Sequence, residues 1–289
     1  MDLRVDFAFK LFLVTGDVRR LVAILNAVFE NKQIPRVVTD LTIVNPALEK
    51  NDVDDKLSVI DVRATLADGT YICIEMHLYD MENLKHKMLR SWSKIYSEEL
   101  AAGKKYIEQN VTVCIAFINA PVTDVNNKPI KKVHTLILPM ERDSHEVLLD
   151  NQEMHFINMK AFMEQCENLT ATGKELDNFS KWMVLINHKD VKDKEMLARI
   201  CADGEMKDAM ETLTVLSADK EARRAYQRRK DNLFIWNEKE EQLKEYIAII
   251  ADTKAQLSDK DAIIADKDAI IAELRAQIAQ ADKLKQQIS

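Results

Sequence analysis

The sequence predicts an α/β fold, followed by a polar helical region and a C-terminal helix with heptad repeats, and three observations lead to this prediction. Short β-branched runs alternate with helical periodicity over residues 1–160. Residues 161–245 are polar and helical in pattern. A seven-residue repeat occupies residues 246–289. We therefore expect a mixed domain, a helical appendage and a heptad-repeat helix with these boundaries.

Composition limits the class of protein. Of 289 residues, 47% are apolar and 31% are charged, which is enough to bury a large core. No apolar run reaches the roughly 18 residues of a membrane helix, and charges interrupt the first twenty residues. We expect a cytoplasmic, bacterial protein with no membrane association. The net charge is −7, so contact with nucleic acid requires a local basic patch.

Cysteine spacing excludes two further classes. The four cysteines are far apart in the sequence, without a CxxC zinc motif or a dense disulfide framework. We expect isolated, buried thiols at Cys73, Cys114, Cys166 and Cys201.

The first part contains the predicted sheet. Asp17 is a helix cap, and an apolar face follows it at three- and four-residue spacing. A second helix is predicted over Glu82–Ala102 and ends at Gly103. This helix lies between predicted strands, which indicates a crossover and parallel pairing in part of the sheet. The predicted strands are Val37–Val44, Leu57–Leu66, Thr70–Leu78, Val111–Ile118 and Val133–Leu138.

The last part repeats every seven residues. Leu257, Ile264, Ile271 and Ile278 keep one phase, which we assign to heptad position a. Position d then carries lysine in two layers, so a coiled coil formed by this repeat is short and weak. A single solvated helix explains the same pattern equally well, and both interpretations remain open. The coiled coil would allow the chain to form a homo-oligomer.

Loop length decides which side chains share a face of the hairpin between Leu57 and Leu78. A two-residue turn at Asp68 and Gly69 sends Asp61 and Glu75 to opposite faces. A three-residue loop with Gly69 in the left-handed conformation pairs Asp61 with Glu75. Only the second register collects the apolar residues on one continuous face, so we predict the second register.

The other face of this hairpin then carries Asp61, Arg63, Glu75 and His77. The Cβ atoms of these two opposed acidic residues lie about 5 Å apart, and their carboxylates repel each other unless a cation lies near them. Mg²⁺ or Mn²⁺ would satisfy both carboxylates, and His77 is close enough to bind the metal or to position a water. The alternative is a solvated side on which Arg63 and Lys56 pair with the acidic residues.

These residues also resemble a known family. Asp61 followed by Glu75-Met76-His77 is similar to the D…E-x-K signature of PD-(D/E)XK nucleases, and especially to their recombination-promoting nuclease/putative transposase branch. The segment Asp6–Phe12 resembles the D-x-A-F-K-x-x-F start of that branch. Further similar positions are Leu25, Asn26, Val62, Ala64, Asp68, Gly69, Ile74, Arg90, Tyr96, Gly103, Tyr106, Trp182 and the helix from Leu216 to Arg229.

The resemblance implies a fold, an activity and a set of site residues. The fold is a central mixed β-sheet flanked by helices, as in restriction endonucleases. The activity is Mg²⁺- or Mn²⁺-dependent DNA cleavage in recombination or transposition. Asp61 and Glu75 would be the metal ligands, with the backbone carbonyl of Met76 as a third. Lys10 would reach the site from the first helix, or would instead pair with Asp6.

Residue 77 departs from the family pattern. The superfamily has lysine there and this branch usually has glutamine, whereas this chain has His77. A neutral imidazole stabilises developing phosphate charge less well than an ammonium group does. Two functions therefore stay open: a metal-dependent endonuclease, and a catalytically degenerate scaffold or DNA-binding protein that self-associates through its C-terminal helix.

The predicted helix after the acidic strand carries a basic stripe. Lys87, Arg90 and Lys94 follow the spacing of one helix face and would contact DNA phosphates. The alternative is an ordinary solvated face.

Overall fold

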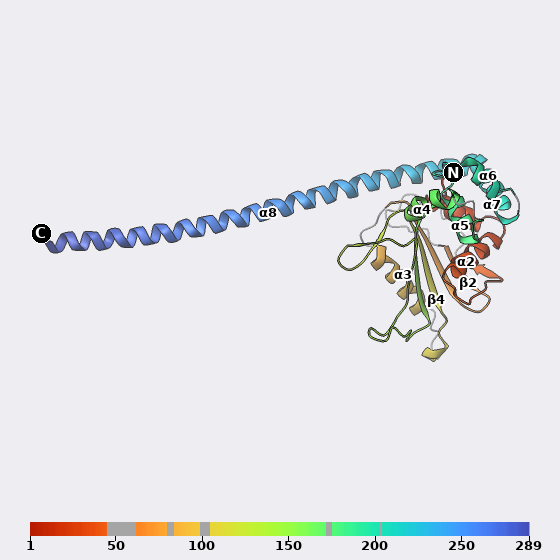
Figure 1. The fold of residues 1–289 in the computed structure, drawn as a ribbon, viewed down its shortest axis with the longest axis horizontal. Helices are drawn as coiled ribbons and strands as arrows, with labels where there is room; N and C mark the ends of the chain where they lie inside the picture. Colours follow the sequence, from red (N-terminus) through yellow and green to blue (C-terminus); the bar gives the residue numbers. More distant parts are fainter. Residues whose placement is uncertain (45–61, 80–83, 99–104, 172–174, 203, 289) are drawn as a thin grey trace. The chain divides into compact units, whose positions relative to one another are not determined.

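The computed structural model describes residues 1–44, 62–79, 84–98, 105–171, 175–202 and 204–288 (Figure 1). The chain divides into two compact units, Met1–Asp231 and Asn232–Ser289. The helices are α1 (Asp6–Val14), α2 (Arg19–Asn31), α3 (Leu84–Glu98), η2 (Tyr106–Glu108), α4 (Met159–Ala171), α5 (Asn178–Ile186), α6 (Lys194–Ile200), α7 (Gly204–Ala218) and α8 (Lys220–Ile288). The strands are β1 (Leu41–Ile43), β2 (Val62–Leu66), β3 (Tyr71–His77), β4 (Thr112–Ile118), β5 (Val122–Thr123), β6 (Pro129–Ile130), β7 (His134–Ile137) and β8 (Gln152–Asn158).

The first unit is built on a six-stranded mixed sheet with the strand order β1-β2-β3-β4-β8-β7. The pairs β1–β2 and β2–β3 are antiparallel, whereas β3, β4 and β8 run parallel. At the far edge β7 is antiparallel to β8. The predicted α/β class, a mixed sheet flanked by helices, is therefore confirmed.

Helix α3 makes the crossover between the parallel strands β3 and β4. It confirms the predicted helix over Leu84–Glu98, and both predicted ends lie outside the described residues. Leu84, Met88 and Ile95 are buried, as their spacing predicts. The indole N–H of Trp92 donates a hydrogen bond to the carbonyl oxygen of Thr112 at 3.0 Å, which fixes α3 to β4.

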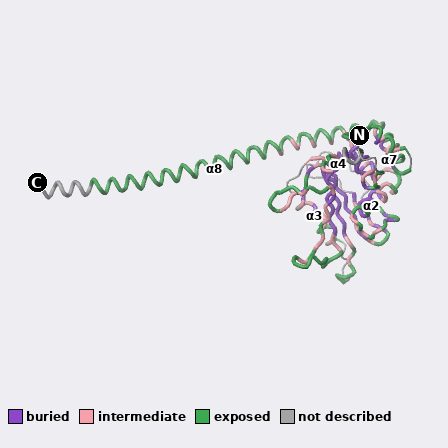
Figure 2. Tube along the Cα trace, in the orientation of Figure 1, coloured by how far each residue is buried: buried purple, intermediate pink, exposed green. Residues whose placement is uncertain are grey.

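Two apolar cores lie on opposite faces of the sheet. Ile115 and Phe117 belong to the larger core, together with residues of α1, α2, α5 and α7. Cys114 and Ala116 belong to a smaller core beneath α3. All seven residues of β4 are buried, which is why the strand is almost entirely apolar. The strands of the sheet appear as the buried centre of Figure 2.

Helix α2 begins just after Asp17, as the sequence predicts, although its N-cap residue is Val18. The Asp17 carboxylate accepts a hydrogen bond from the backbone N–H of Arg19 at 2.8 Å, and Arg19 is the first residue of α2. The predicted apolar face is buried, with exposures of 0–1% at Leu21, Ile24, Leu25 and Val28. Three of the four cysteines, Cys73, Cys114 and Cys166, are buried as expected, and Cys201 is half-buried.

Strand β8 is a part of the sheet that the sequence analysis missed. It lies between β4 and β7, yet it carries Glu153 and His155 in its interior. Arg36 donates hydrogen bonds to both oxygens of Glu153 at 2.9 Å. Arg36, which offsets the buried charge of Glu153, therefore comes from the segment after α2. No sequence pattern near Glu153 indicates this partner. The short hairpin of β5 and β6 was not predicted either.

A second histidine extends this buried network. His134 Nε2 lies 2.9 Å from His155 Nδ1, and His134 Nδ1 lies 2.8 Å from Asn31 Oδ1. Burial, with smaller contributions from His155 and Lys32, lowers the pKa of His134 to about 2. Burial also lowers the pKa of His155. Both imidazoles are therefore neutral at neutral pH, and a single proton bridges them.

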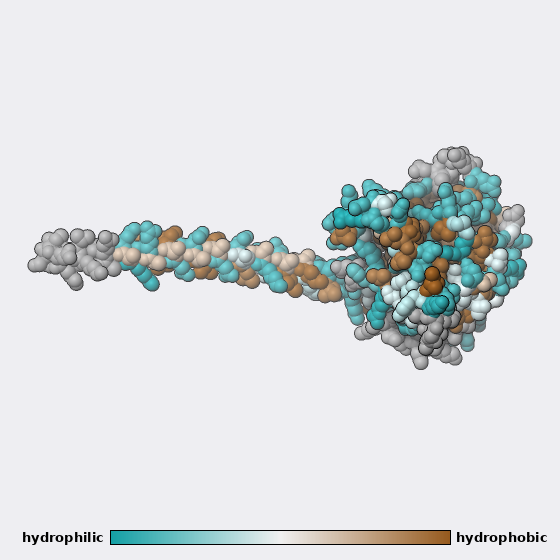
Figure 3. Space-filling view, turned by 90° about the horizontal axis from the view of Figure 1, so that it is seen from below, coloured by the Kyte–Doolittle hydropathy of each residue, from teal (hydrophilic) through white to brown (hydrophobic). Residues whose placement is uncertain are grey.

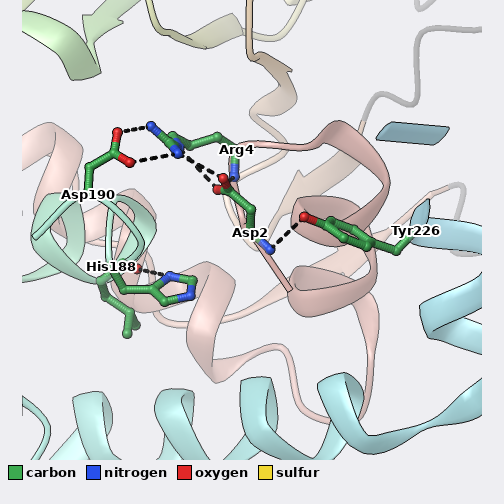
Figure 4. Close-up of polar contacts among 6 residues, drawn as sticks. Asp2, Arg4, His188, Asp190 and Tyr226 are labelled. Carbon is green, nitrogen blue, oxygen red and sulfur yellow. Dashed lines mark hydrogen bonds and ion pairs between the residues drawn. The ribbon is translucent and has the colours of Figure 1, made fainter. Parts of the chain in front are cut away.

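The N-terminal segment is held by polar contacts with distant parts of the first unit (Figure 4). Arg4 binds the carboxylate of Asp2 at 2.8 Å and that of Asp190, between α5 and α6, at 3.1 Å. The backbone N–H of Asp2 donates to the hydroxyl of Tyr226 at 3.2 Å. These contacts join the start of the chain to the first turns of α8.

The second unit consists of the rest of α8. Every side chain from residue 241 to residue 278 is exposed (Figure 2). Among the described residues, no helix combines the length and the apolar character that a bilayer crossing requires.

Candidate active site

The hairpin of β2 and β3 has the three-residue loop that the sequence predicts. Val62 pairs with Ile74 and Ala64 pairs with Ile72. The backbone N–H of Leu66 donates to the carbonyl oxygen of Thr70 at 2.9 Å, and Gly69 has φ of +88°. Val62, Ala64, Ile72 and Ile74 all face the larger core, so the predicted register is confirmed for the described residues.

Glu75 is the centre of the opposite face of β3, and its side chain is 0% exposed. Its Oε2 atom lies 2.9 Å from Nε2 of His77 and 3.0 Å from Nζ of Lys87. Its Oε1 atom accepts a hydrogen bond from the hydroxyl of Ser91 at 3.0 Å. Two elements therefore supply the three partners, because His77 belongs to β3 and the other two belong to α3.

These contacts keep the carboxylate ionised. Burial is the largest influence and acts to raise the pKa of Glu75, but the hydrogen bond from His77 and the ammonium group of Lys87 outweigh it. The net result is a pKa lowered to about 2. Glu75 is therefore an anion with fixed orientation at neutral pH, as a metal ligand must be.

His77 is neutral in the same surroundings. Burial lowers the pKa of His77 and outweighs the opposing effect of the hydrogen bond with Glu75. An ionised carboxylate can only accept hydrogen bonds. The Nε2 atom of His77 therefore carries the ring proton and donates a hydrogen bond to Glu75. The Nδ1 atom then carries the lone pair of the ring. The Asp6 carboxylate in α1 also favours the charged form of His77, so the start of α1 lies near this end of β3.

The expected alternative, a solvated side of the hairpin, is wrong for the described residues. Helix α3 covers this face, and Glu75 and His77 are buried beneath it. Arg63 is partly exposed and lies 3.9 Å from Glu98. Lys56 lies outside the described residues.

The other predicted site residues are distributed around this cluster. Asp61, the first predicted metal ligand, lies outside the described residues. Met76 is buried in β3, between Glu75 and His77. Lys10 is buried in α1, with 3% of its surface exposed. Its alternative partner Asp6 forms an ion pair with Arg229 of α8.

The predicted basic stripe separates into two parts. Lys87 reaches the sheet and forms the ion pair with Glu75. Arg90 is exposed, and Lys94 is exposed and lies 3.8 Å from Glu98. Of the three residues of the stripe, only Arg90 and Lys94 therefore present their charge at the surface of α3.

The site roles of Lys87 and Ser91 were missed by the sequence analysis, although a signal was present. Leu84, Met88 and Ile95 mark the buried face of α3, and Ser91 falls on that same face. Lys87 lies four residues before Ser91, at the edge of the face. A lysine and a serine beside an apolar helix face that covers an acidic strand indicate a buried polar contact.

Comparison with known proteins now adds to this geometry. A family model described as PD-(D/E)XK nuclease family transposase matches residues 3–259. Searches among curated proteins and among solved structures found no match. The matched region includes the whole sheet, α3 and the acidic hairpin, and nucleases of this superfamily generally use divalent metals. The match covers most of the chain, and the mixed sheet fits it, so the protein belongs to the PD-(D/E)XK nuclease family of transposases.

Proposed function

We propose that the protein is a metal-dependent DNA endonuclease that acts in recombination or transposition. The observation that carries this proposal is the buried, ionised Glu75 on β3, held between His77 and Lys87. A buried carboxylate with cationic and hydrogen-bonding partners at a family's signature position is characteristic of a catalytic centre.

The donor atoms fit a hard divalent cation. Glu75 supplies an anionic oxygen, and the carbonyl of Met76 supplies a second oxygen. Among the described residues, no three acidic, histidine or cysteine side chains are grouped so that they could hold a metal ion. The proposed site therefore needs Asp61. The register predicted from the sequence places Asp61 opposite Glu75, and the described pair Val62–Ile74 belongs to that register.

Each residue has a role in the proposed hydrolysis. Asp61, Glu75 and the Met76 carbonyl would hold Mg²⁺ or Mn²⁺, which when bound stabilises phosphate charge and lowers the pKa of a water. The Nδ1 lone pair of His77 would position that water or accept its proton. Lys10 remains a proposed contributor from α1.

Lys87 is proposed to replace the lysine that the superfamily carries at residue 77. Its ammonium group already lies 3.0 Å from Glu75, so it can offset the negative charge that develops on a phosphate bound there. Arg90 and Lys94 remain the proposed contacts with the DNA backbone, since both are exposed on the same helix.

The test is nicking of supercoiled plasmid in Mg²⁺, in Mn²⁺ and in EDTA. Native protein should cut only with metal, and Asp61→Asn and Glu75→Gln should each abolish cutting and weaken Mn²⁺ binding. Glu98→Gln removes an exposed carboxylate from α3 and should change neither property. Folded protein that leaves the plasmid intact in both metals, or a Glu75→Gln variant as active as the native chain, would refute the proposal.

A second candidate is a catalytically degenerate scaffold. It is favoured by the fact that both oxygens of Glu75 already have partners within the chain. In that case DNA binding, measured by electrophoretic mobility shift, would persist in EDTA, and no metal would support cutting.

A further inference from the structure

Helix α8 carries a long apolar stripe in the second unit. Six residues at seven-residue spacing form it, beginning two heptads before the repeat that the sequence analysis singled out. Their side chains are 45–62% exposed, and the six residues are Leu243, Ile250, Leu257, Ile264, Ile271 and Ile278. At 1.5 Å per residue the stripe is about 50 Å long. We name it the a-stripe.

A second set of isoleucines widens the stripe. Ile249, Ile263 and Ile270 each precede a residue of the a-stripe, and they are 53–57% exposed. Figure 3 shows apolar side chains recurring along the described part of α8. A row of exposed large apolar side chains of this length is uncommon on a monomer and marks an interaction surface.

The part of α8 from residue 241 to residue 278 has no buried face of the kind that normally stabilises a helix. Isolated helices depend on the burial of an apolar face, because helical propensity alone gives little stability. Every side chain from residue 241 to residue 278 is exposed, so the part of the chain that the structure describes does not supply that burial. A partner helix would supply it.

We propose that the a-stripe packs against the a-stripe of a second copy of this chain, as a parallel, in-register, two-stranded coiled coil. Every copy carries the same stripe in the same phase, so identical layers meet without any further partner. Isoleucine at position a favours two parallel strands where leucine fills position d, as Leu274 does in one layer. The proposal does not depend on catalysis.

The charges at positions d and e support pairing with a second copy of the chain in a parallel, in-register arrangement. Lys260 and Lys267 occupy position d, and Asp261 and Asp268 follow them at position e. In a parallel, in-register pair, a side chain at d lies beside position e of the partner helix. Each of the two lysines therefore meets an aspartate of the other copy, which offsets the cost of charge in the seam.

The test is the mass of the full chain by sedimentation equilibrium over a wide concentration range. We expect the mass of two chains. Ile264→Asp combined with Ile271→Asp should give a monomer. Ala262→Asp combined with Ala269→Asp makes the same change in charge on the opposite side of the helix and should leave the dimer intact. Lys267→Leu should tighten the dimer on the order of tenfold, because it replaces a charged layer with an apolar one.

Three outcomes overturn the proposal: a monomer at every concentration, a mass of three or four chains, and a seam variant that stays as dimeric as its control. Spin labels at Ala248→Cys, in a Cys201→Ser background, test the orientation. A parallel pair brings the two labels to within the width of two helices. A separation of roughly 40 Å or more would show an antiparallel pair instead.

Discussion

At the residue scale, Glu75 shows how a buried charge is kept in this fold. Removing a carboxylate from water is costly unless charged partners and hydrogen bonds replace its hydration. Lys87, His77 and Ser91 do so at 2.9–3.0 Å. The same contacts that make the charge tolerable also fix its orientation, which is what a metal ligand requires.

Lys87 can be tested separately from its neighbours. Lys87→Ala should slow plasmid nicking about a hundredfold or more, because the site loses its ammonium group. His77→Lys in the Lys87→Ala background should restore part of the rate, since it returns a lysine to the position where the superfamily has one. Lys94→Ala, an exposed lysine of the same helix, should leave nicking per bound DNA unchanged.

The measurement is the single-turnover nicking rate, with Mn²⁺ affinity determined in parallel. If Lys87→Ala lowers thermal stability but cuts at the native rate, Lys87 only pairs with Glu75 and has no role in cleavage. If Mn²⁺ affinity falls together with the rate, Lys87 acts by positioning Glu75.

At the element scale, the β2–β3 hairpin sets which residues share a face, and Gly69 sets the hairpin. Its φ of +88° lies in the left-handed region, and a Cβ atom there would lie 3.1 Å from the Asn110 side chain. A side chain at residue 69 therefore disfavours this loop, and with it the register that places Glu75 and His77 on one face of the hairpin.

Gly69→Ala should lower the free energy of unfolding by about 1 kcal/mol or more, because both backbone strain and a close contact oppose the new methyl group. Gly16→Ala is the matched control, since Gly16 also has positive φ, at +79°, but its nearest neighbour would be 4.0 Å away. Urea unfolding compares the two variants. Equal losses would show that the contact with Asn110 contributes nothing.

At the scale of the whole molecule, buried ionisable groups make stability depend on pH. The folded state lowers the pKa of His134 to about 2 and also lowers the pKa of His155 and of His77. Between the folded and unfolded pKa values the unfolded chain binds more protons, so stability rises with pH there. The contribution of these histidines to the free energy of unfolding is complete above about pH 6.5 and decreases as the solution is acidified.

We therefore expect the free energy of unfolding to fall below pH 6.5, by up to about 1.4 kcal/mol per pH unit for each buried histidine. Glu75, whose pKa is lowered to about 2, adds a second loss that begins near pH 4.5. His134→Gln should be less stable than the native chain at pH 7.5 yet lose less stability on acidification. His145→Gln, at an exposed site, should follow the native curve; a native curve that is flat from pH 7 to pH 5 would contradict the prediction.

The sequence by itself determined the α/β class, the hairpin register and the crossover helix, because each depends on periodicity or loop length within one short segment. Only the tertiary structure decided that β8 joins the sheet, that α3 buries the acidic face, and that Lys87 pairs with Glu75. Arg36 and Glu153 are 117 positions apart, and Ser91 and Glu75 are 16 apart. A buried charge is identified by its partner, and here the partners come from other elements of the fold.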